Sequence, residues 1–146
     1  MKKFLDILCF IGLFIWQLPQ NIVAIVMLPF LGKLRKVEYR DYCFAFEGSK
    51  MSGGISLGNF IFLSKTCTKS VTTIAHEYGH VKDSHRFGIL YLFIIGIPSI
   101  CWAAFKSSDK CYYSFFTEKR ANKNAGLGVD TKCRLYFLDK PDYKKK

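Results

Sequence analysis

The stretch His76-Glu77-Tyr78-Gly79-His80 constrains this chain more than any other part of it. Residues four apart share one face of a helix, so His76 and His80 can bind one metal ion while Glu77 lies beside them. Zinc held by three protein ligands keeps a fourth position for water, and a neighbouring carboxylate can take a proton from that water. The spacing therefore predicts a zinc site with two histidine ligands and Glu77 as the general base.

A site of this kind needs a third ligand, and the sequence offers a carboxylate for it. In metzincin zinc peptidases a third histidine ligand lies six residues after the second. Here that position is Arg86, and His85 lies one residue before it. Glu118 belongs to a predicted helix over residues 111–124, in which Asn122 follows one turn later on the same face. We predict Glu118 as the third ligand and Asn122 as the amide that holds its carboxylate in place.

Two apolar runs predict that the chain associates with a membrane. Residues 4–32 contain no Lys or Arg and a single acid, and residues 87–105 contain no charged residue. Runs of this length are candidates for membrane insertion. The net charge of +11 comes from basic residues that flank these runs, which favours anionic lipid over nucleic acid as the partner. We predict localisation in the inner or cytoplasmic membrane with the active site on the cytoplasmic side. The sequence does not indicate an oligomeric state.

The N-terminal run, residues 4–31, is expected to be a retained apolar anchor, since no small-residue cleavage site follows it. The polar segment Gln17-Leu18-Pro19-Gln20-Asn21 interrupts it. The run could cross a bilayer once with a kink at Pro19, or form two half-length helices that turn at the polar segment. The sequence leaves both alternatives open.

A small β-hairpin is predicted over residues 37–64. Residues 37–46 and 55–64 are rich in aromatic and β-branched residues, and a segment containing Gly and Ser joins them. The second strand could pack against the helices, or it could be an edge strand that offers backbone groups to an extended peptide. In either role, the hairpin is predicted to be part of a single α+β domain that spans residues 1–146.

Residues 70–124 are predicted to form an antiparallel, zinc-binding helical hairpin. Ser70 is the expected N-cap of its first helix. A reversal at Gly96-Ile97-Pro98-Ser99, partway into the membrane, would place both histidines level with Glu118, because the two arms have nearly equal length. A full crossing by residues 87–105 would instead separate the ligands by about 30 Å of hydrocarbon. Beyond the hairpin, a short strand over residues 133–138 precedes a basic tail, residues 139–146, which we expect to be solvated or to face lipid.

The cysteines are predicted to be reduced thiols. The chain contains 6 of them, none in a Cys-x-x-Cys pair, and two lie inside the apolar runs. An even count would permit disulfides in an exported protein, but the spacing does not require them.

Two motifs resemble those of the membrane gluzincin zinc peptidases, the group that includes the CaaX prenyl-protein proteases and the bacterial heat-shock membrane endopeptidase. The stretch from His76 to His85 is similar to the HExGHxxxxH motif of that group, and Glu118-Lys119-Arg120-Ala121-Asn122 is similar to its ExxAD motif. The resemblance implies zinc bound by His76, His80 and Glu118, and a general-base role for Glu77. Asn122 replaces the usual Asp, and only 37 residues separate His80 from Glu118. The chain would thus be a minimal relative, or belong to a separate small membrane family that shares the metal site.

The leading hypothesis is a zinc-dependent, membrane-associated endopeptidase that acts on a protein or peptide substrate. The alternative is a small non-catalytic membrane protein of the interaction or immunity type that retains a zinc site. Intact Glu77 favours the enzyme, because a structural zinc site needs no general base. His85 could steady a substrate oxygen or lie at a membrane interface, and Tyr112 and Tyr113 could donate to an oxyanion or anchor the chain in lipid.

Overall fold

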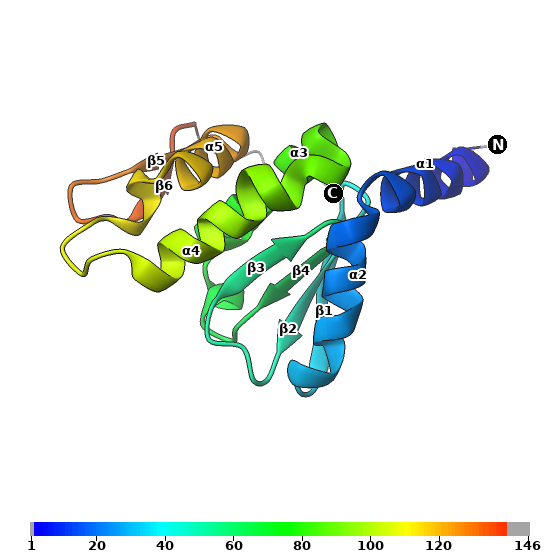
Figure 1. Ribbon diagram of the computed structural model, residues 1–146, viewed down its shortest axis with the longest axis horizontal. Coiled ribbons are helices and arrows are strands. Elements are labelled where there is room, and N and C mark those ends of the chain that lie inside the picture. Colours follow the sequence, from blue (N-terminus) through cyan, green and yellow to red (C-terminus); the bar gives the residue numbers. More distant parts are fainter. Residues whose placement is uncertain (1, 140–146) are drawn as a thin grey trace.

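The computed structural model describes residues 2–139 and confirms the α+β class (Figure 1). Of the predicted basic tail, residues 140–146 lie outside the described residues. The helices are α1 (Lys2–Trp16), α2 (Leu18–Met27), α3 (Val71–Phe87), α4 (Ile97–Phe105) and α5 (Phe116–Ala125). The strands are β1 (Leu34–Arg40), β2 (Cys43–Gly48), β3 (Gly54–Leu57), β4 (Phe60–Leu63), β5 (Leu127–Val129) and β6 (Leu135–Phe137).

The predicted single β-hairpin over residues 37–64 is wrong, because each of its two expected strands is itself a hairpin. Residues 34–63 form a four-stranded sheet in the order β1-β2-β4-β3, with β2 parallel to β4 and the other pairs antiparallel. Asp41 and Tyr42 turn the chain between β1 and β2 with positive φ angles of 51° and 58°. Gly58, at φ +60°, begins the two-residue turn between β3 and β4. Strand β3 is consequently an edge strand.

The sheet separates two apolar clusters, as the alternation along β4 requires. Ile61 and Leu63 pack with Tyr78 and Val81 of α3 in one cluster. Phe62, whose side chain alternates to the opposite face, packs with Ala24 of α2 in the other. Full burial of a side chain of this size contributes roughly 1.5–3 kcal/mol. The two clusters fix α3 against one face of the sheet and α2 against the other.

The N-terminal segment forms two helices rather than one straight rod. The parts over Lys3–Trp16 and Leu18–Phe30 meet at an angle of 87°, so they make a corner and not a hairpin. In Figure 1, α1 extends away from the sheet. Within residues 2–139, no single helix is long and apolar enough to cross a membrane, and this bent pair meets that requirement only when both parts are counted together.

The polar break between α1 and α2 is buried against the protein. Asn21 and Asn59 bond to each other twice, since Asn21 Nδ2 donates to Asn59 Oδ1 over 2.9 Å and the Asn59 backbone N–H donates to Asn21 Oδ1 over 2.8 Å. Gln20 Nε2 donates to the carbonyl of Gly88 over 2.7 Å. The polar segment therefore attaches α2 to the β3–β4 turn and to the end of α3.

The predicted reversal at Gly96–Ser99 is wrong, because the chain reverses at Gly88. Gly88 ends α3 with φ +51°, and a Cβ there would lie 2.1 Å from the indole of Trp16. Gly96 is helical, with φ −60° and ψ −59°, and Pro98 lies in the first turn of α4, where its missing N–H costs nothing. The segment from Gly88 to Phe105 runs back along α3, since Ser99 lines a cavity together with Glu77 and His80. The chain then turns between Phe105 and Phe116 and leads into α5 (Figure 1).

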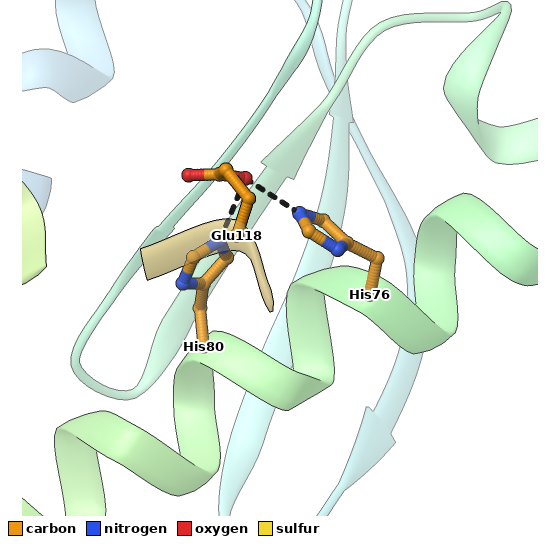
Figure 2. A group of neighbouring side chains, drawn as sticks. All are labelled: His76, His80 and Glu118. Atoms are coloured by element: carbon orange, nitrogen blue, oxygen red, sulfur yellow. Dashed lines mark hydrogen bonds and ion pairs between the residues drawn. The ribbon is translucent and has the colours of Figure 1, made fainter. Parts of the chain in front are cut away.

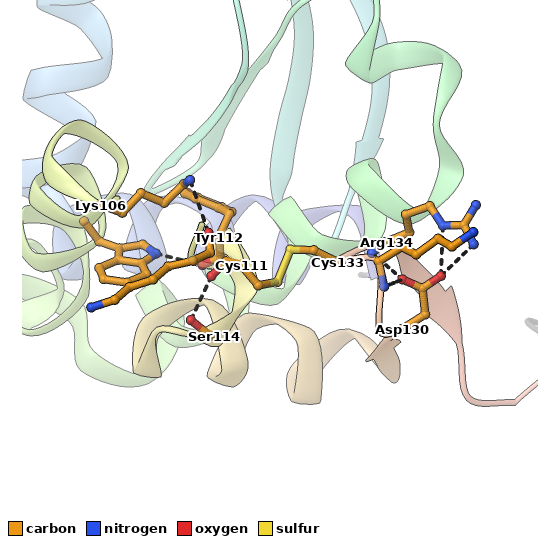
Figure 3. Close-up of a disulfide and its surroundings, with 10 residues drawn as sticks. Lys106, Cys111, Tyr112, Ser114, Asp130, Cys133 and Arg134 are labelled. Carbon is orange, nitrogen blue, oxygen red and sulfur yellow. Dashed lines mark hydrogen bonds and ion pairs between the residues drawn. A yellow bond between two sulfur atoms is a disulfide. The ribbon is translucent and has the colours of Figure 1, made fainter. Parts of the chain in front are cut away.

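The prediction that all cysteines are reduced is wrong for one pair. Cys111 and Cys133 form a disulfide with a Cα–Cα distance of 5.5 Å (Figure 3). The pairing depends on the path of the intervening chain. Helix α5 ends at Gly126, as predicted, with φ +68°, and β5 and β6 then turn the chain back. Cys9, Cys43, Cys67 and Cys101 are free thiols.

Candidate metal centre

Helix α3 presents both histidines of the sequence motif on one face. Ser70 caps the helix as predicted, since its side chain accepts a hydrogen bond from the Thr73 backbone N–H over 3.2 Å. His76 and His80 project from successive turns of α3, and Glu118 reaches them from α5 (Figure 2). The structure thus brings together the three residues predicted as ligands.

The three side chains have the spacing of a metal-binding group. His76 Nε2 lies 3.1 Å and His80 Nε2 lies 3.4 Å from the same atom, Glu118 Oε2. All three ligand atoms lie within 4.8 Å of one another, and all three residues are buried. Tetrahedral ligands about 2.0–2.1 Å from a zinc ion are roughly 3.3 Å apart. The group could therefore hold a metal ion after small movements of its side chains.

The surroundings of Glu118 keep its carboxylate ionised, which is the form that binds a cation. Burial alone would raise the pKa of Glu118, but hydrogen bonds with His76 and His80 outweigh it and hold that pKa far below its ordinary value. Burial would lower the pKa of His76, yet the contact with Glu118 and the charge of Glu77 raise it overall. The hydroxyls of Ser99 and Thr117 donate to the other carboxylate oxygen, Oε1, which leaves Oε2 facing the histidines.

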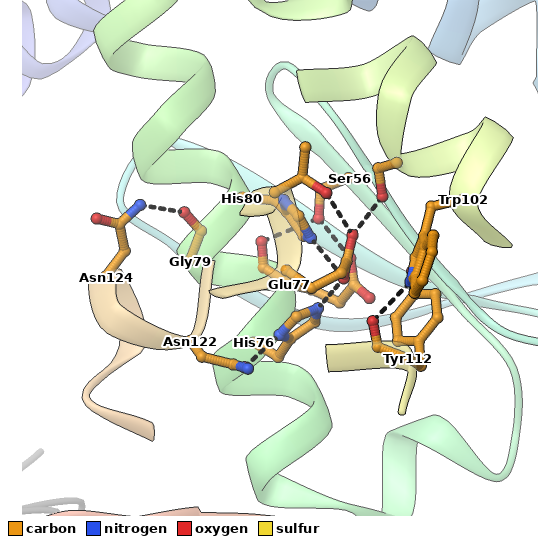
Figure 4. A network of polar contacts seen from close by, with 12 residues as sticks. Ser56, His76, Glu77, Gly79, His80, Trp102, Tyr112, Asn122 and Asn124 are labelled. Carbon is orange, nitrogen blue, oxygen red and sulfur yellow. Dashed lines mark hydrogen bonds and ion pairs between the residues drawn. The ribbon is translucent and has the colours of Figure 1, made fainter. Parts of the chain in front are cut away.

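Glu77 lies beside the metal group, and strand β3 holds its carboxylate. The Ser56 hydroxyl donates to Glu77 Oε2 over 2.7 Å and also lies 2.9 Å from the Glu77 carbonyl (Figure 4). Oxygen Oε1 lies so close to Gly54 that a Cβ there would stand 2.4 Å away. No sequence pattern indicated this role for Ser56, because it depends on how β3 packs against α3.

A cavity of about 100 Å³ opens next to Glu77 and His80. Residues of β3 and residues between Tyr91 and Ala103 line it. Tyr112 also lines this cavity. Burial and the charge of Glu118 raise the Tyr112 pKa above its ordinary value, so its hydroxyl stays protonated and can donate a hydrogen bond.

Asn122 is close to the metal group but contacts a different residue from the one predicted. Its Oδ1 accepts a hydrogen bond from His76 Nδ1 over 2.7 Å, so it orients the imidazole rather than the carboxylate of Glu118. The Tyr113 ring packs edge-on against His76, with 5.2 Å between the ring centroids. Burial raises the pKa of Tyr113 to about 12. Two neighbours thus fix the His76 ring.

His85 lies apart from the cavity that contains Glu77. It is in the last turn of α3, and its backbone carbonyl accepts a hydrogen bond from Trp16 Nε1 over 3.0 Å. Burial lowers the pKa of His85, and the charge of Asp41 opposes this effect. The residues that line the cavity do not include His85. Ser99, which no sequence pattern indicated, takes part instead through its bond to Glu118.

No family model, curated protein or solved structure matches this chain. Residues of both motifs that resemble the membrane gluzincins nevertheless meet in one buried group.

Proposed function

We propose that this chain is a zinc-dependent endopeptidase associated with a membrane. One observation carries the proposal. Glu77 and His80 line one cavity, and His80 also belongs to the buried three-residue group. A general base, a set of metal ligands and open space therefore adjoin one another. A site that only stabilises the fold would need neither the base nor the space.

The donor set fits zinc, which prefers imidazole nitrogen and carboxylate oxygen in three-ligand catalytic sites. When bound, zinc supplies Lewis acidity that polarises a carbonyl group and acidifies water. Glu77 would take the proton from the attacking water and later return it to the leaving amine. Ser56 holds the Glu77 carboxylate in one orientation, and the Tyr112 hydroxyl donates to the developing oxyanion.

An extended peptide is the substrate that best suits the cavity. Strand β3 is at the edge of the sheet, and all of its residues line the cavity. A peptide can pair with such an edge through main-chain hydrogen bonds, which do not depend on its sequence. The Tyr91 hydroxyl donates to the Ser56 carbonyl over 3.4 Å, so a substrate that pairs with this edge beside Ser56 would displace that contact.

Membrane association would supply membrane proteins as substrates. Large apolar side chains of α1 are exposed, among them Phe4 at 64%, Ile7 at 57% and Ile15 at 62%. The basic residues Lys2 and Lys3 begin this helix. Apolar groups beside cations suit an anionic lipid surface.

Zinc stoichiometry and cleavage test the proposal together. Purified wild type in detergent is compared with Glu118→Ala, and both are incubated with a panel of membrane-protein substrates. We expect one zinc per chain and cleavage for the wild type, and loss of both for the variant. Wild type that binds no zinc would refute the proposal. Wild type that binds zinc but cleaves nothing would favour a non-catalytic membrane protein.

A further inference from the structure

One wall of the cavity beside Glu77 is held less firmly than the others. Residues of β3 and α3 belong to the two apolar clusters of the fold. Every residue of α4, in contrast, is exposed or half-buried, although Ser99, Ile100 and Ala103 of this helix line the cavity. An element with few buried apolar contacts opens at a small cost in free energy. Helix α4 is therefore the wall that can move.

The cavity has to widen before a peptide can enter it. Its volume of about 100 Å³ is well below the roughly 300–1,000 Å³ of typical ligand sites. Ile100 lines the cavity and is also 53% exposed, so α4 forms part of its rim. A movement of α4 away from β3 would enlarge the opening next to Glu77.

The chain has a weak point at each end of α4. Leu92–Gly96 form a π-helical turn, a feature that often marks a functional site. Pro98 has no N–H with which to bond a carbonyl on the other side of Gly96. At the other end, an irregular loop over residues 106–110 follows the helix. Helix α4 can therefore turn as a unit between Gly96 and this loop.

Two side chains of α4 attach it to the stretch that begins α5. The Ser99 hydroxyl donates to Glu118, and Trp102 Nε1 donates to the Tyr112 carbonyl over 2.8 Å (Figure 4). The Trp102 ring also stacks on Phe115, with 4.9 Å between the ring centroids. These contacts hold α4 against the cavity in the closed form that the structure describes.

The outer face of α4 is an apolar stripe. Ile97, Cys101 and Phe105 follow one another at intervals of four residues, which keeps their side chains on one face of a helix. Ile97 is 51% and Phe105 is 85% exposed, and Cys101 is exposed as well. Lys106 and Lys110 follow the stripe, in a chain with a net charge of +11. Apolar side chains next to cations suit an anionic lipid surface.

We propose that α4 is a lid over the cavity, and that an anionic bilayer opens it by binding the stripe of Ile97, Cys101 and Phe105. In the open form, lipid also covers Ile100 and Ala103. The bilayer then binds the open form more tightly than the closed one, and such a difference is what shifts an equilibrium between two forms. The need to admit a peptide rests on the proposed function, whereas the docking of α4 on lipid does not.

Docking is tested with the fluorophore NBD, whose emission rises in apolar surroundings, attached to the native thiol of Cys101. Full-length protein that carries Cys9→Ser and Cys67→Ser is mixed with vesicles of phosphatidylcholine, alone or with phosphatidylglycerol. We expect the emission to rise at least threefold with the anionic vesicles and to stay constant with the neutral ones. Anionic vesicles that bind the protein without changing the emission would show that α1 docks alone, and this result would overturn the proposal.

Substitutions identify the side chains that bind the vesicles. Ile97→Ser combined with Phe105→Ser should weaken binding to anionic vesicles at least fivefold. Leu138→Ser is the matched control, since it removes an apolar side chain that is 60% exposed after β6, and it should leave binding unchanged. Wild type that dimerises without lipid, while the double variant stays monomeric, would assign the stripe to a second copy of the chain and refute the bilayer as its partner.

Opening is tested by electron paramagnetic resonance, with spin labels on Cys101 and on Lys123→Cys in α5. We expect anionic vesicles to lengthen the distance between the labels by about 5 Å or more, the rise of one helical turn. Labels on Lys65→Cys and Lys123→Cys, in protein with Cys101→Ser, exclude α4 and should keep their distance. An unchanged distance from Cys101 in docked protein would rule out the lid. Neither measurement uses zinc or cleavage, so a failure of the proposed function is detected separately by the zinc and cleavage assays.

Discussion

Gly79 lies directly against the backbone of Ala121, where α5 crosses α3. A Cβ added to Gly79 would stand 2.0 Å from the Ala121 carbonyl oxygen, closer than any real contact allows. This close approach brings Glu118 and Asn122 of α5 to His76. The glycine between the two histidines is thus needed for the third ligand to reach them.

Gly79→Ala should force the two helices apart. Overpacking of this kind costs about 1–3 kcal/mol, and we expect zinc affinity to fall at least tenfold because Glu118 moves with α5. Chelator competition and thermal unfolding measure the two effects. Gly53→Ala is the matched control, since a Cβ at Gly53 has nothing within 4 Å. Gly79→Ala protein that behaves like Gly53→Ala would contradict the account of the contact.

Ser56→Ala should slow hydrolysis without removing zinc. Ser56 contacts the carboxylate of Glu77 and none of the three ligands. A hydrogen bond to a charged group is worth about 1.5–3 kcal/mol, so kcat/KM should fall roughly 10- to 100-fold. Ser107→Ala, in the loop after α4, provides the control. Unchanged turnover in Ser56→Ala would show that Glu77 does not need this partner.

Zinc affinity should decrease as the pH falls. The pKa of His76 is raised above its ordinary value of about 6.5, so protons compete with the metal from above pH 6.5 downward. The folding stability of the metal-free protein depends on pH in the opposite direction. The raised pKa of His76 stabilises the fold below about pH 6.5, and this contribution disappears as the pH rises through the pKa of folded His76. Zinc titrations between pH 8 and pH 5.5 test this. An affinity that stays constant over that range would rule out proton competition at His76.

Removing the disulfide should destabilise the α5 region. The bond joins residues 22 apart in sequence, and closing a loop of that length stabilises a fold by roughly 3 kcal/mol. We expect Cys111→Ser combined with Cys133→Ser to lower the free energy of unfolding by about that amount. Cys101→Ser, which removes an exposed free thiol, should leave it unchanged. Identical unfolding of wild type with and without reductant would argue against the bond.

The sequence was most informative where structure depends on neighbours along the chain. The spacing of His76 and His80 sets their common face, Ser70 caps its own helix, and Gly126 ends α5. These features follow from helical geometry and backbone preference alone, so they could be predicted. Glu118 was also found, because it belongs to a second motif with helical spacing.

Features that depend on long-range packing were missed. The parallel pairing of β2 with β4 is not encoded by either strand alone. The reversal at Gly88 depends on Trp16, which packs on that glycine from 72 residues away in the sequence. Asn122 was assigned to Glu118 because they share a helix face, yet the approach of α5 to α3 presents it to His76.

Glu77→Gln tests the central claim most directly, because it separates the general base from the metal ligands. The amide has nearly the same shape as the carboxylate, and Glu77 is not among the three residues of the metal group. We predict one zinc per chain in this variant, as in the wild type, and a rate of peptide cleavage lower by a factor on the order of 10² to 10⁴. His80→Ala, measured in parallel, should lose zinc and activity together. A Glu77→Gln protein that cleaves peptide at the wild-type rate would contradict the hydrolytic mechanism.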